Sequence, residues 1–200
     1  VAHVCDRLGL PGTTCEAALN ATDKFRMRGV LRDAGVAVPD FALLGAEEIE
    51  AGRYDAVREA VALPVVVKPV DSMGARGVVR ADTWAEAERF ARDAVGFSRS
   101  GRVVVEGYID GPEFSLDAIV YDDDVQITGI ADRHIRFPPY FIEVGHTIPT
   151  SAPGDVRRRV EAEFVRAIRA LGIGPGAAKG DVKYSSAGPV IGEVAARLSG

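Results

Sequence analysis

The chain has 200 residues, of which 47% are hydrophobic and 26% charged, and its formal net charge at pH 7 is −5. This composition is ordinary for a globular protein. The acidic balance argues against a general nucleic-acid or membrane-surface binder, although it leaves a local basic pocket open. No apolar run approaches the roughly 20 residues of a membrane helix. Cys5 and Cys15 fit neither a metal pair nor a disulfide scaffold, which indicates a reduced, cytoplasmic setting.

The first 80 residues predict helices followed by short apolar strands. Residues 1–22 are expected to form a short helix and a loop. Thr22 is the expected N-cap of a helix that ends at Gly35, a candidate left-handed C-cap. Residues 65–67 then predict a buried strand, because three valines follow one another, and residues 77–80 predict a second short strand.

The middle of the chain alternates between a helix and longer strands. Thr83 begins a capping box and opens a helix. Residues 102–106 predict an apolar strand, and residues 113–121 predict a strand with alternating polar and apolar side chains. Residues 122–124, three aspartates in a row, predict a turn into the next strand at 125–132.

The last third of the chain combines an irregular segment, a helix and a hairpin. Residues 133–154 are expected to be irregular because they are rich in aromatic residues and proline. The next helix has an apolar stripe at near-fourfold spacing, formed by Val156, Val160, Phe164, Ile168 and Leu171. Strands occur mainly in pairs, which predicts an α+β fold with largely antiparallel sheets.

Two carboxylates lie either side of the hairpin at the end of the chain. If residues 186–188 form a three-residue loop, Asp181 falls opposite Glu193. Like charges there repel, and a divalent cation would turn the pair into a ligand set. The alternative is a pair of solvated carboxylates on a surface hairpin. Lys183, on the face of Asp181, and Arg197, four residues after Glu193, suit a site for phosphate or carboxylate anions.

Further candidate binding residues lie at strand ends. Lys68 ends an apolar strand and precedes a loop that contains Gly74 and Gly77, where exposed backbone N–H groups could bind a polyphosphate. The alternative is a glycine-rich turn with a solvated lysine. Glu106 and Glu113, near neighbouring strand ends, could hold ribose hydroxyls or could belong to a solvent-facing stripe.

Histidine and arginine side chains gather in the segment 133–154, which contains His134, Arg133, Arg136 and His146. Either this segment is a loop of solvated polar residues, or it faces a substrate. In the second case His146 would contact a substrate carboxylate or amine.

Five segments in order resemble the ATP-grasp superfamily: DK at 23–24, PVVVKP at 64–69, SMGARG at 72–77, VVVEGYIDGPEFSLD at 103–117, and GDVKYSSAGPVIGEVAARLSG at 180–200. The resemblance implies an ATP-grasp fold in which two α+β lobes, with mainly antiparallel sheets, clamp ATP. It also implies a segment of a longer chain. Its parts would be the exit from a mostly absent N-terminal domain at 1–22, a first lobe with the glycine-rich flap at 23–107, and a second lobe with the metal and substrate side at 108–200.

The resemblance assigns an ATP-binding set to this sequence. The phosphates would be contacted by Lys24 and Lys68 and covered by a flap that contains Ser72, Gly74, Arg76 and Gly77. The adenine edge would be read by an interlobe hinge of Glu106, Gly107 and Tyr108, and the ribose would be bound by Glu113.

The resemblance also implies the metal and substrate residues. Asp181 and Glu193 resemble Mg²⁺ ligands, with Mn²⁺ as an alternative metal, and Arg197 resembles the arginine that steadies the acyl phosphate. Lys183 and His146 complete the residues expected to act on the substrates. Many members of the superfamily carry an asparagine where this chain has Ala195, so one of two expected metal ions would be held more loosely or would use water.

The activity implied is that of an ATP- and Mg²⁺-dependent ligase, closest to the branch that contains L-amino-acid ligases. It would join a small carboxylate, such as an amino acid, to an amine or thiol through an acyl phosphate, with release of ADP. The expected partners are small-molecule substrates rather than nucleic acid or membrane, and a homodimer is left open. The alternatives are an ATP-grasp carboxylase or purine-pathway synthetase, a non-catalytic ATP-binding module, and a purely structural domain.

Overall fold

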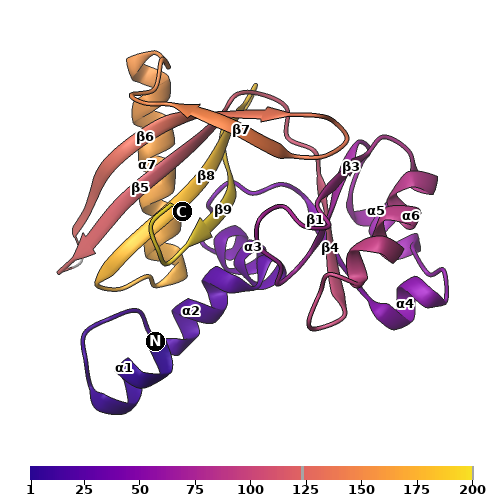
Figure 1. Ribbon diagram of the computed structural model, residues 1–200, viewed down its shortest axis with the longest axis horizontal. Coiled ribbons are helices and arrows are strands. Elements are labelled where there is room, and N and C mark those ends of the chain that lie inside the picture. Colours follow the sequence, from indigo (N-terminus) through magenta and orange to yellow (C-terminus); the bar gives the residue numbers. More distant parts are fainter. Residues whose placement is uncertain (123, 200) are drawn as a thin grey trace. The chain divides into compact units, whose positions relative to one another are not determined.

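A computed structural model describes residues 1–122 and 124–199 (Figure 1). The chain forms two compact units, and we describe each by itself. The first consists of Val1–Val38, Ile109–His134 and Gly145–Gly200, and the second of Pro39–Tyr108 and Ile135–Val144. These units group the chain differently from the predicted parts 1–22, 23–107 and 108–200, whose functional assignment stays a prediction.

Most of a five-stranded sheet, in the order β7-β6-β5-β8-β9, belongs to the first unit; the end of β6 and the start of β7 belong to the second. Its pairings β5–β6, β5–β8 and β8–β9 are antiparallel. The strands are β5 (Glu113–Tyr121), β6 (Asp124–Arg136), β7 (Ile142–Thr147), β8 (Gly176–Ser185) and β9 (Gly188–Ala195).

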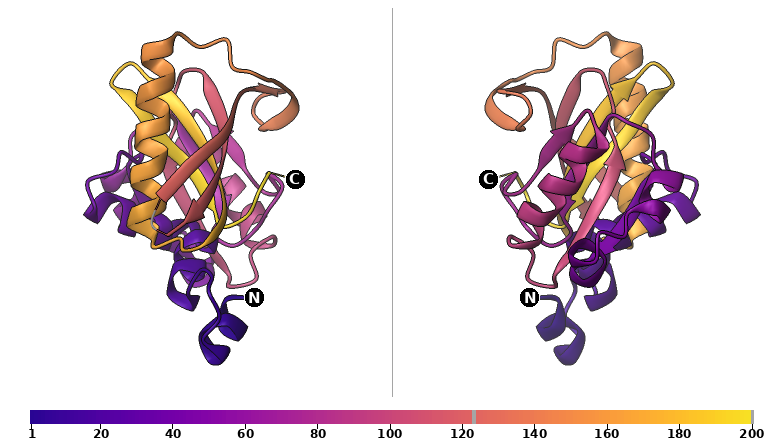
Figure 2. Two further views of the ribbon diagram at one scale, coloured as in Figure 1. Left: turned by 90° about the vertical axis from the view of Figure 1, so that its left-hand side faces the viewer. Right: turned by 90° about the vertical axis from the view of Figure 1, so that its right-hand side faces the viewer.

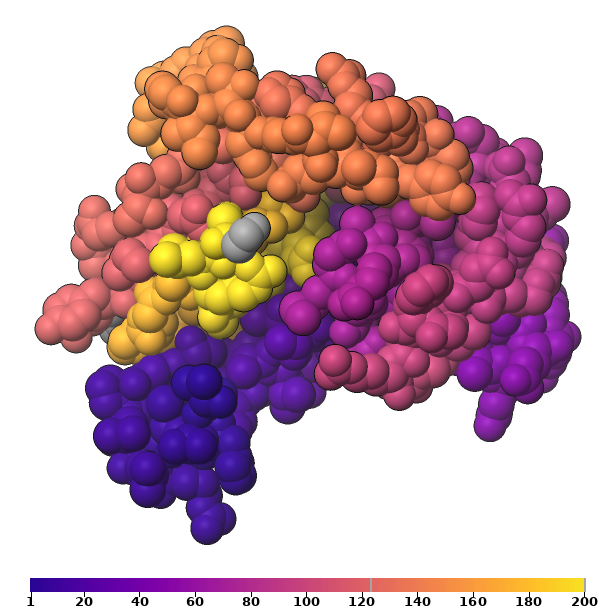
Figure 3. Space-filling view, viewed as in Figure 1, coloured from indigo at the N-terminus to yellow at the C-terminus, as the bar shows by residue number. Residues whose placement is uncertain are grey.

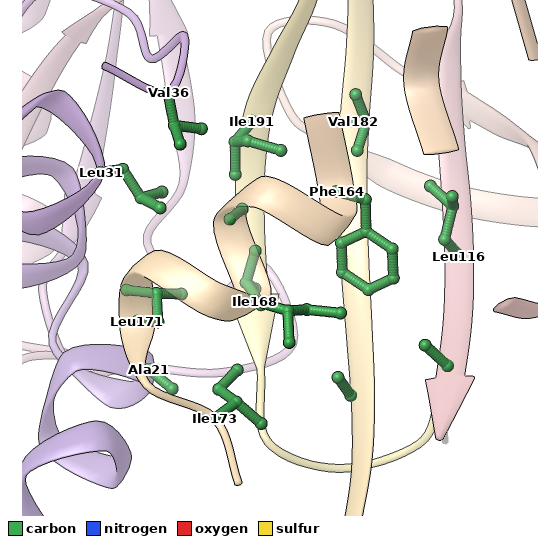
Figure 4. Close-up of a cluster of buried hydrophobic side chains, with 14 of the residues drawn as sticks. Ala21, Leu31, Val36, Leu116, Phe164, Ile168, Leu171, Ile173, Val182 and Ile191 are labelled. Carbon is green, nitrogen blue, oxygen red and sulfur yellow. The ribbon is translucent and has the colours of Figure 1, made fainter. Parts of the chain in front are cut away.

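Helix α7 (Gly154–Leu171) lies alongside β8 and β9 in both views of Figure 2. Its predicted stripe is confirmed: Phe164 and Ile168 are fully buried and pack with Val182 and Ile191 of the sheet (Figure 4). The first unit also contains α1 (Ala2–Leu8), α2 (Cys15–Thr22) and α3 (Lys24–Asp33). Among the described residues, no helix combines the length and the apolar character needed to cross a membrane.

The second unit is built on a four-stranded sheet in the order β1-β4-β2-β3, with antiparallel pairings throughout this order. Alternate valines of its strands are buried under α6, as the apolar runs predict. The elements are β1 (Phe41–Gly45), α4 (Ala46–Glu50), α5 (Asp55–Ala60), β2 (Val65–Pro69), β3 (Val79–Ala81), α6 (Trp84–Val95) and β4 (Arg102–Gly107). The prediction of an α+β fold with mainly antiparallel sheets is therefore confirmed.

Two local predictions are wrong. Thr22 does not cap α3, because it is the last residue of α2 and its hydroxyl donates to the carbonyl of Ala18 at 2.8 Å. Asp23 is the N-cap instead, and its carboxylate accepts from the backbone N–H of Arg26 at 3.0 Å. An aspartate directly after a helix thus ends one helix and starts the next.

The segment 133–154 is also more regular than predicted, since β6 continues to Arg136 and β7 follows. The prolines that suggested irregular structure lie at 138–139, between the strands, and at 149 and 153, beyond β7, so they interrupt neither ladder. The predicted turn at 122–124 includes Asp123, which lies outside the described residues; Asp124 begins β6.

Candidate functional site

The β8–β9 hairpin brings the two carboxylates together by a route that differs from the predicted one. Ser185 pairs with Gly188, so the loop has two residues rather than the predicted three. A β-bulge then shifts the register next to Asp181, and this shift brings Glu193 opposite it. The predicted opposition of Asp181 and Glu193 is confirmed, although its predicted cause, the loop length, is wrong.

Asp181 lies in a cationic setting within the first unit. Its side chain is 8% exposed, and its Oδ2 is 2.6 Å from Lys179 Nζ and 3.0 Å from Arg133 Nη1. Its buried Oδ1 has no hydrogen-bond partner among the described residues. Burial raises the pKa of Asp181 above its usual value, Arg133 and Lys179 oppose that rise, and Glu193 adds to it. A further cation at Oδ1 would therefore favour the ionised carboxylate.

Glu193 faces a lysine from helix α3. Lys24 Nζ lies 3.6 Å from Glu193 Oε1, and the lysine side chain is only 10% exposed, whereas that of Glu193 is 40% exposed. Asp23, as the N-cap of α3, fixes where this helix begins and so where Lys24 lies. The DK pair of the sequence therefore supplies one helix cap and one cation beside the hairpin.

Acidic and basic side chains alternate across the polar face of β5 and β8. The facing pairs are Glu113 with Lys183, Ser115 with Asp181, and Asp117 with Lys179. Lys183 Nζ is 3.6 Å from Glu113 Oε2 and donates to the carbonyl of Ile109 at 3.1 Å.

The sequence reasoning placed Arg133 in a segment that could face a substrate, but it did not predict that Arg133 contacts the carboxylates of the site. Its guanidinium bonds to Glu113 and also reaches Asp181. The sequence could have predicted this contact, because an antiparallel β5–β6 hairpin places Arg133 beside Glu113, one step beyond the Phe114–Asp132 pair. The contact was not predicted because residues 133–154 were expected to be irregular.

Arg197 lies in the exposed segment after β9, which is yellow in the space-filling view (Figure 3). Its Nη1 donates to the carbonyl of Leu198 at 2.8 Å. The same segment is fastened to β5, because Asp117 Oδ1 accepts from the backbone N–H of Ser199 at 2.9 Å and from its hydroxyl at 3.0 Å. Asp117 is thus a second residue near the predicted site that the sequence did not single out.

In the second unit, Lys68 on β2 and Glu106 on β4 form a close ion pair. Lys68 Nζ is 2.6 Å from Glu106 Oε2, and the two side chains are 15% and 3% exposed. The strands are neighbours in the sheet, which places the two predicted residues within reach of each other. This burial of the Lys68 side chain argues against the alternative of a solvated lysine beside a glycine-rich turn.

The predicted flap is the connection between β2 and β3, and it contains Ser72. Gly74 and Gly77 both have left-handed backbone, with φ of 69° and 71°. At Gly77 a Cβ atom would lie 2.9 Å from Pro69 Cγ, so the position excludes a side chain. Arg76 is exposed and its Nε donates to the carbonyl of Met73 at 3.1 Å. These residues form a turn-rich loop, and their contact with phosphates stays a prediction.

Two backbone N–H groups of the predicted adenine hinge already donate hydrogen bonds within the second unit. The backbone N–H of Gly107 donates to Asp40 and that of Tyr108 donates to Pro64, both at 2.9 Å. Neither N–H can donate to a base without losing that bond. The Arg80 guanidinium stacks 4.2 Å from the centre of the Tyr108 ring, a contact that the sequence did not predict.

His146 lies on β7, at an exposed position, rather than in an irregular loop. Its neighbour Thr147 shares a hydrogen bond with His134, at 2.8 Å between Oγ1 and Nε2. The substrate contact of His146 stays a prediction.

Comparison with known proteins supports the resemblance on independent grounds. Residues 21–200 match the ATP-grasp domain family. The chain belongs to this family. The predicted recognition and fold class are therefore confirmed, and the carboxylates, lysines and glycine loop described above lie in an ATP-grasp domain.

The ATP-grasp chain is similar to several ligases. It is 33% identical to a D-alanine–D-alanine ligase of Desulforudis audaxviator over 82% of this chain and 56% of that protein. An uncharacterized protein y4rH of Sinorhizobium fredii is 29% identical over 100% of this chain and 41% of its own length. The solved L-amino acid ligase of Bacillus licheniformis superposes with a TM-score of 0.83 at 28% identity, covering 100% of this chain and 46% of that one. The chain thus spans about half the length of the relatives it matches.

The donor set of this ATP-grasp chain fits a small divalent cation. Carboxylate oxygens are what Mg²⁺ prefers, and Asp181 Oδ1 is a buried oxygen that lacks a hydrogen-bond partner among the described residues. In the described part of the chain, no three histidine, cysteine or acidic side chains gather into a metal-binding group. Asp181 and Glu193 would therefore share the ion with water or phosphate oxygens, which is usual for Mg²⁺. Ala195, opposite Lys179, offers no further side-chain oxygen.

Proposed function

We propose that this chain is the ATP- and Mg²⁺-binding part of a ligase that joins a small carboxylate to an amine, with ADP and phosphate as the other products. The observation that carries the proposal is the facing pair of Asp181 and Glu193, with a buried carboxylate oxygen that lacks a hydrogen-bond partner among the described residues. Cationic side chains contact both carboxylates: Lys179 and Arg133 at Asp181, and Lys24 at Glu193. The ligases among its relatives support the reaction class.

In the proposed reaction an oxygen of the substrate carboxylate attacks the γ-phosphorus of ATP, and the bond to the ADP oxygen breaks. The amine then attacks the acyl phosphate, loses a proton and displaces phosphate. A bound Mg²⁺ would neutralise phosphate charge during the first step. Asp181 and Glu193 would hold that ion.

The cationic residues of the chain would supply most of the remaining catalysis, because phosphoryl transfer depends on positioning and charge stabilisation. Lys24 and Lys68 would bind phosphate oxygens, with Arg76 as a further contact from the flap. Arg197 would stabilise the negative charge of the acyl phosphate. Lys183, beside Glu113, would contribute positive charge on the same polar face as Asp181.

The remaining predicted residues have supporting roles in this proposal. Glu113 would bind the ribose, which requires it to exchange contact with Arg133 or Lys183 for the sugar hydroxyls. Glu106, Gly107 and Tyr108 would bind the adenine, and the occupied N–H groups of Gly107 and Tyr108 favour their other polar groups for that contact. His146 would meet a substrate carboxylate or amine.

The test is ADP formation by the full-length protein with pairs of amino acids, with products identified by mass spectrometry. Activity should require Mg²⁺ or Mn²⁺, and Glu193→Ala should lower kcat by about 10²–10³-fold, as the loss of an electrostatic stabiliser does. Asp155→Ala, which removes an exposed carboxylate of α7 in the same unit, is the matched control and should change little. Full activity of Glu193→Ala would refute the metal assignment.

The second candidate is a synthetase of the purine-pathway type. It is favoured by the similarity to the solved phosphoribosylglycinamide synthetase of Anaerococcus prevotii, at a TM-score of 0.70 and 25% identity over 99% of this chain and 48% of that one. The same product analysis separates the two, because ADP formation would then require a phosphorylated sugar amine together with glycine rather than a pair of amino acids. ATP binding without ADP formation for any carboxylate would instead indicate a binding module.

A further inference from the structure

Helix α3 contacts the bulge of β9 through buried side chains. Arg28 Nη2 donates to the backbone carbonyl of Gly192 at 2.5 Å. One residue earlier on the helix, Met27 Sδ accepts from the backbone N–H of Val194 at 3.4 Å. These bonds join the helix to the two residues that flank Glu193 along β9.

Arg28 is fully buried, with 0% of its surface exposed. A buried guanidinium is costly unless it is bonded, so such a residue is seldom found without a fixed partner. Lys24 lies four residues earlier, one turn up the same face of the helix, and it reaches Glu193. One face of α3 therefore binds the carbonyl before Glu193 and the carboxylate of Glu193 itself.

The bulge at Gly192 needs such an anchor. A bulge disrupts the strand ladder and turns the neighbouring side chain, so the backbone groups there require other partners. Gly192 also lies close to the opposite strand, since a Cβ atom at this position would be 3.0 Å from the Asp181 carbonyl oxygen. The bulge thus lies close to the Asp181 backbone, and Arg28 bonds to its carbonyl.

We propose that Arg28 is a positioning residue for the metal site: by binding the Gly192 carbonyl it holds the bulge that presents Glu193 opposite Asp181. This inference rests on the proposed function, because it takes Glu193 to be a metal ligand. Arg28 acts through Glu193, and its bond is to the backbone rather than to either carboxylate.

The experiment is a titration of the full-length protein with Mn²⁺ alone, in which electron paramagnetic resonance measures the free ion. Arg28→Met should weaken Mn²⁺ binding by about 10- to 100-fold, as the loss of residues that orient metal ligands does. Arg28→Lys, which keeps a charged donor on a shorter side chain, should give an affinity between those of Arg28→Met and the wild type.

The matched control is Arg159→Met. Arg159 is an exposed arginine of α7 that contacts Tyr184 near the turn of the same hairpin, away from the bulge. The Arg159→Met variant should have a lower unfolding midpoint than the wild type but the same Mn²⁺ affinity. A change of the same size in both methionine variants would show that general loosening of the hairpin, rather than Arg28, sets the affinity, and would overturn the proposal.

A folded Arg28→Met variant with wild-type Mn²⁺ affinity also overturns it. If that variant does not fold, Gly192→Ala decides, because the added methyl group must shift the bulge against the Asp181 carbonyl. Unchanged affinity there refutes the proposal, and a tenfold loss supports it. Glu193→Ala in the same titration separates the proposed metal site from the proposed role of Arg28. If Glu193→Ala binds Mn²⁺ like the wild type, the proposed metal site is refuted. If Glu193→Ala loses binding while Arg28→Met keeps it, only the role of Arg28 is refuted.

Discussion

The two compact units bury their charged residues in different ways. In the second unit, Lys68 and Glu106 join adjacent strands as an ion pair 2.6 Å apart. In the first unit, Asp181 contacts both Lys179 and Arg133 through one oxygen. The shared cations make Asp181 tolerant of losing one contact.

The largest effect is expected from breaking the pair in the second unit. Lys68→Met leaves the Glu106 carboxylate, 3% exposed, without its lysine and should lower the free energy of unfolding by about 3 kcal/mol. Urea unfolding measures the loss, and hydrogen exchange of β2 and β4 locates it. The double variant Lys68→Met with Glu106→Leu should recover most of the stability. A double variant as unstable as Lys68→Met would contradict this account.

A smaller loss is expected in the first unit. Lys179→Met leaves Arg133 at 3.0 Å from Asp181, so the carboxylate stays paired. The free energy of unfolding should therefore fall by only about 1–2 kcal/mol. The measurement is urea unfolding with EDTA present, so that no metal ion contributes. A loss as large as that of Lys68→Met would mean that Arg133 does not compensate.

The smallest effect is expected when the pH is lowered. It concerns one aspartate from each unit, Asp132 of the first and Asp71 of the second, each of which accepts hydrogen bonds from serine residues elsewhere in the chain. Burial alone would raise the pKa of Asp132, and that of Asp71, but hydrogen bonds hold both below the ordinary value of 3.8; Ser151 and Thr150 donate to Asp132, and Ser98 and Ser100 donate to Asp71.

A lowered pKa means that each carboxylate stabilises the folded state above 3.8 and loses that contribution as the pH falls through its lowered pKa. Unfolding midpoints between about pH 2 and pH 5 should therefore depend less on pH in Asp132→Asn and Asp71→Asn than in the wild type. An unchanged pH profile in both variants would rule out this contribution.

Much of the fold could be predicted because its signals are local. The valine runs of β2 and β4, the alternation of β5, the stripe of α7 and the capping box at Thr83 each depend on neighbouring residues, and the structure has all of them. The cap of α3 was misplaced by one residue, since Thr22 and Asp23 are both good N-caps and only the end of α2 decides between them.

The site was less predictable, because its contacts join residues far apart in the chain. Arg133 on β6 reaches Asp181 on β8, Asp117 on β5 accepts from Ser199 in the segment after β9, and Arg28 on a helix reaches Gly192 on a strand. No local pattern distinguishes Arg28 from a surface arginine of an amphipathic helix. The ATP, metal and substrate roles of the predicted residues depend on ligands and stay predictions.

The bulge in β9 makes the hairpin tolerant of one change in chain length. Gly192 is the extra residue of the strand, since Ile191 pairs with Val182 and Glu193 pairs with Asp181. Deletion of Gly192 should therefore leave the two-residue turn and a regular ladder in which Asp181 still faces Glu193. Related chains that lack this residue should keep the carboxylate pair, and an engineered hairpin can dispense with the bulge.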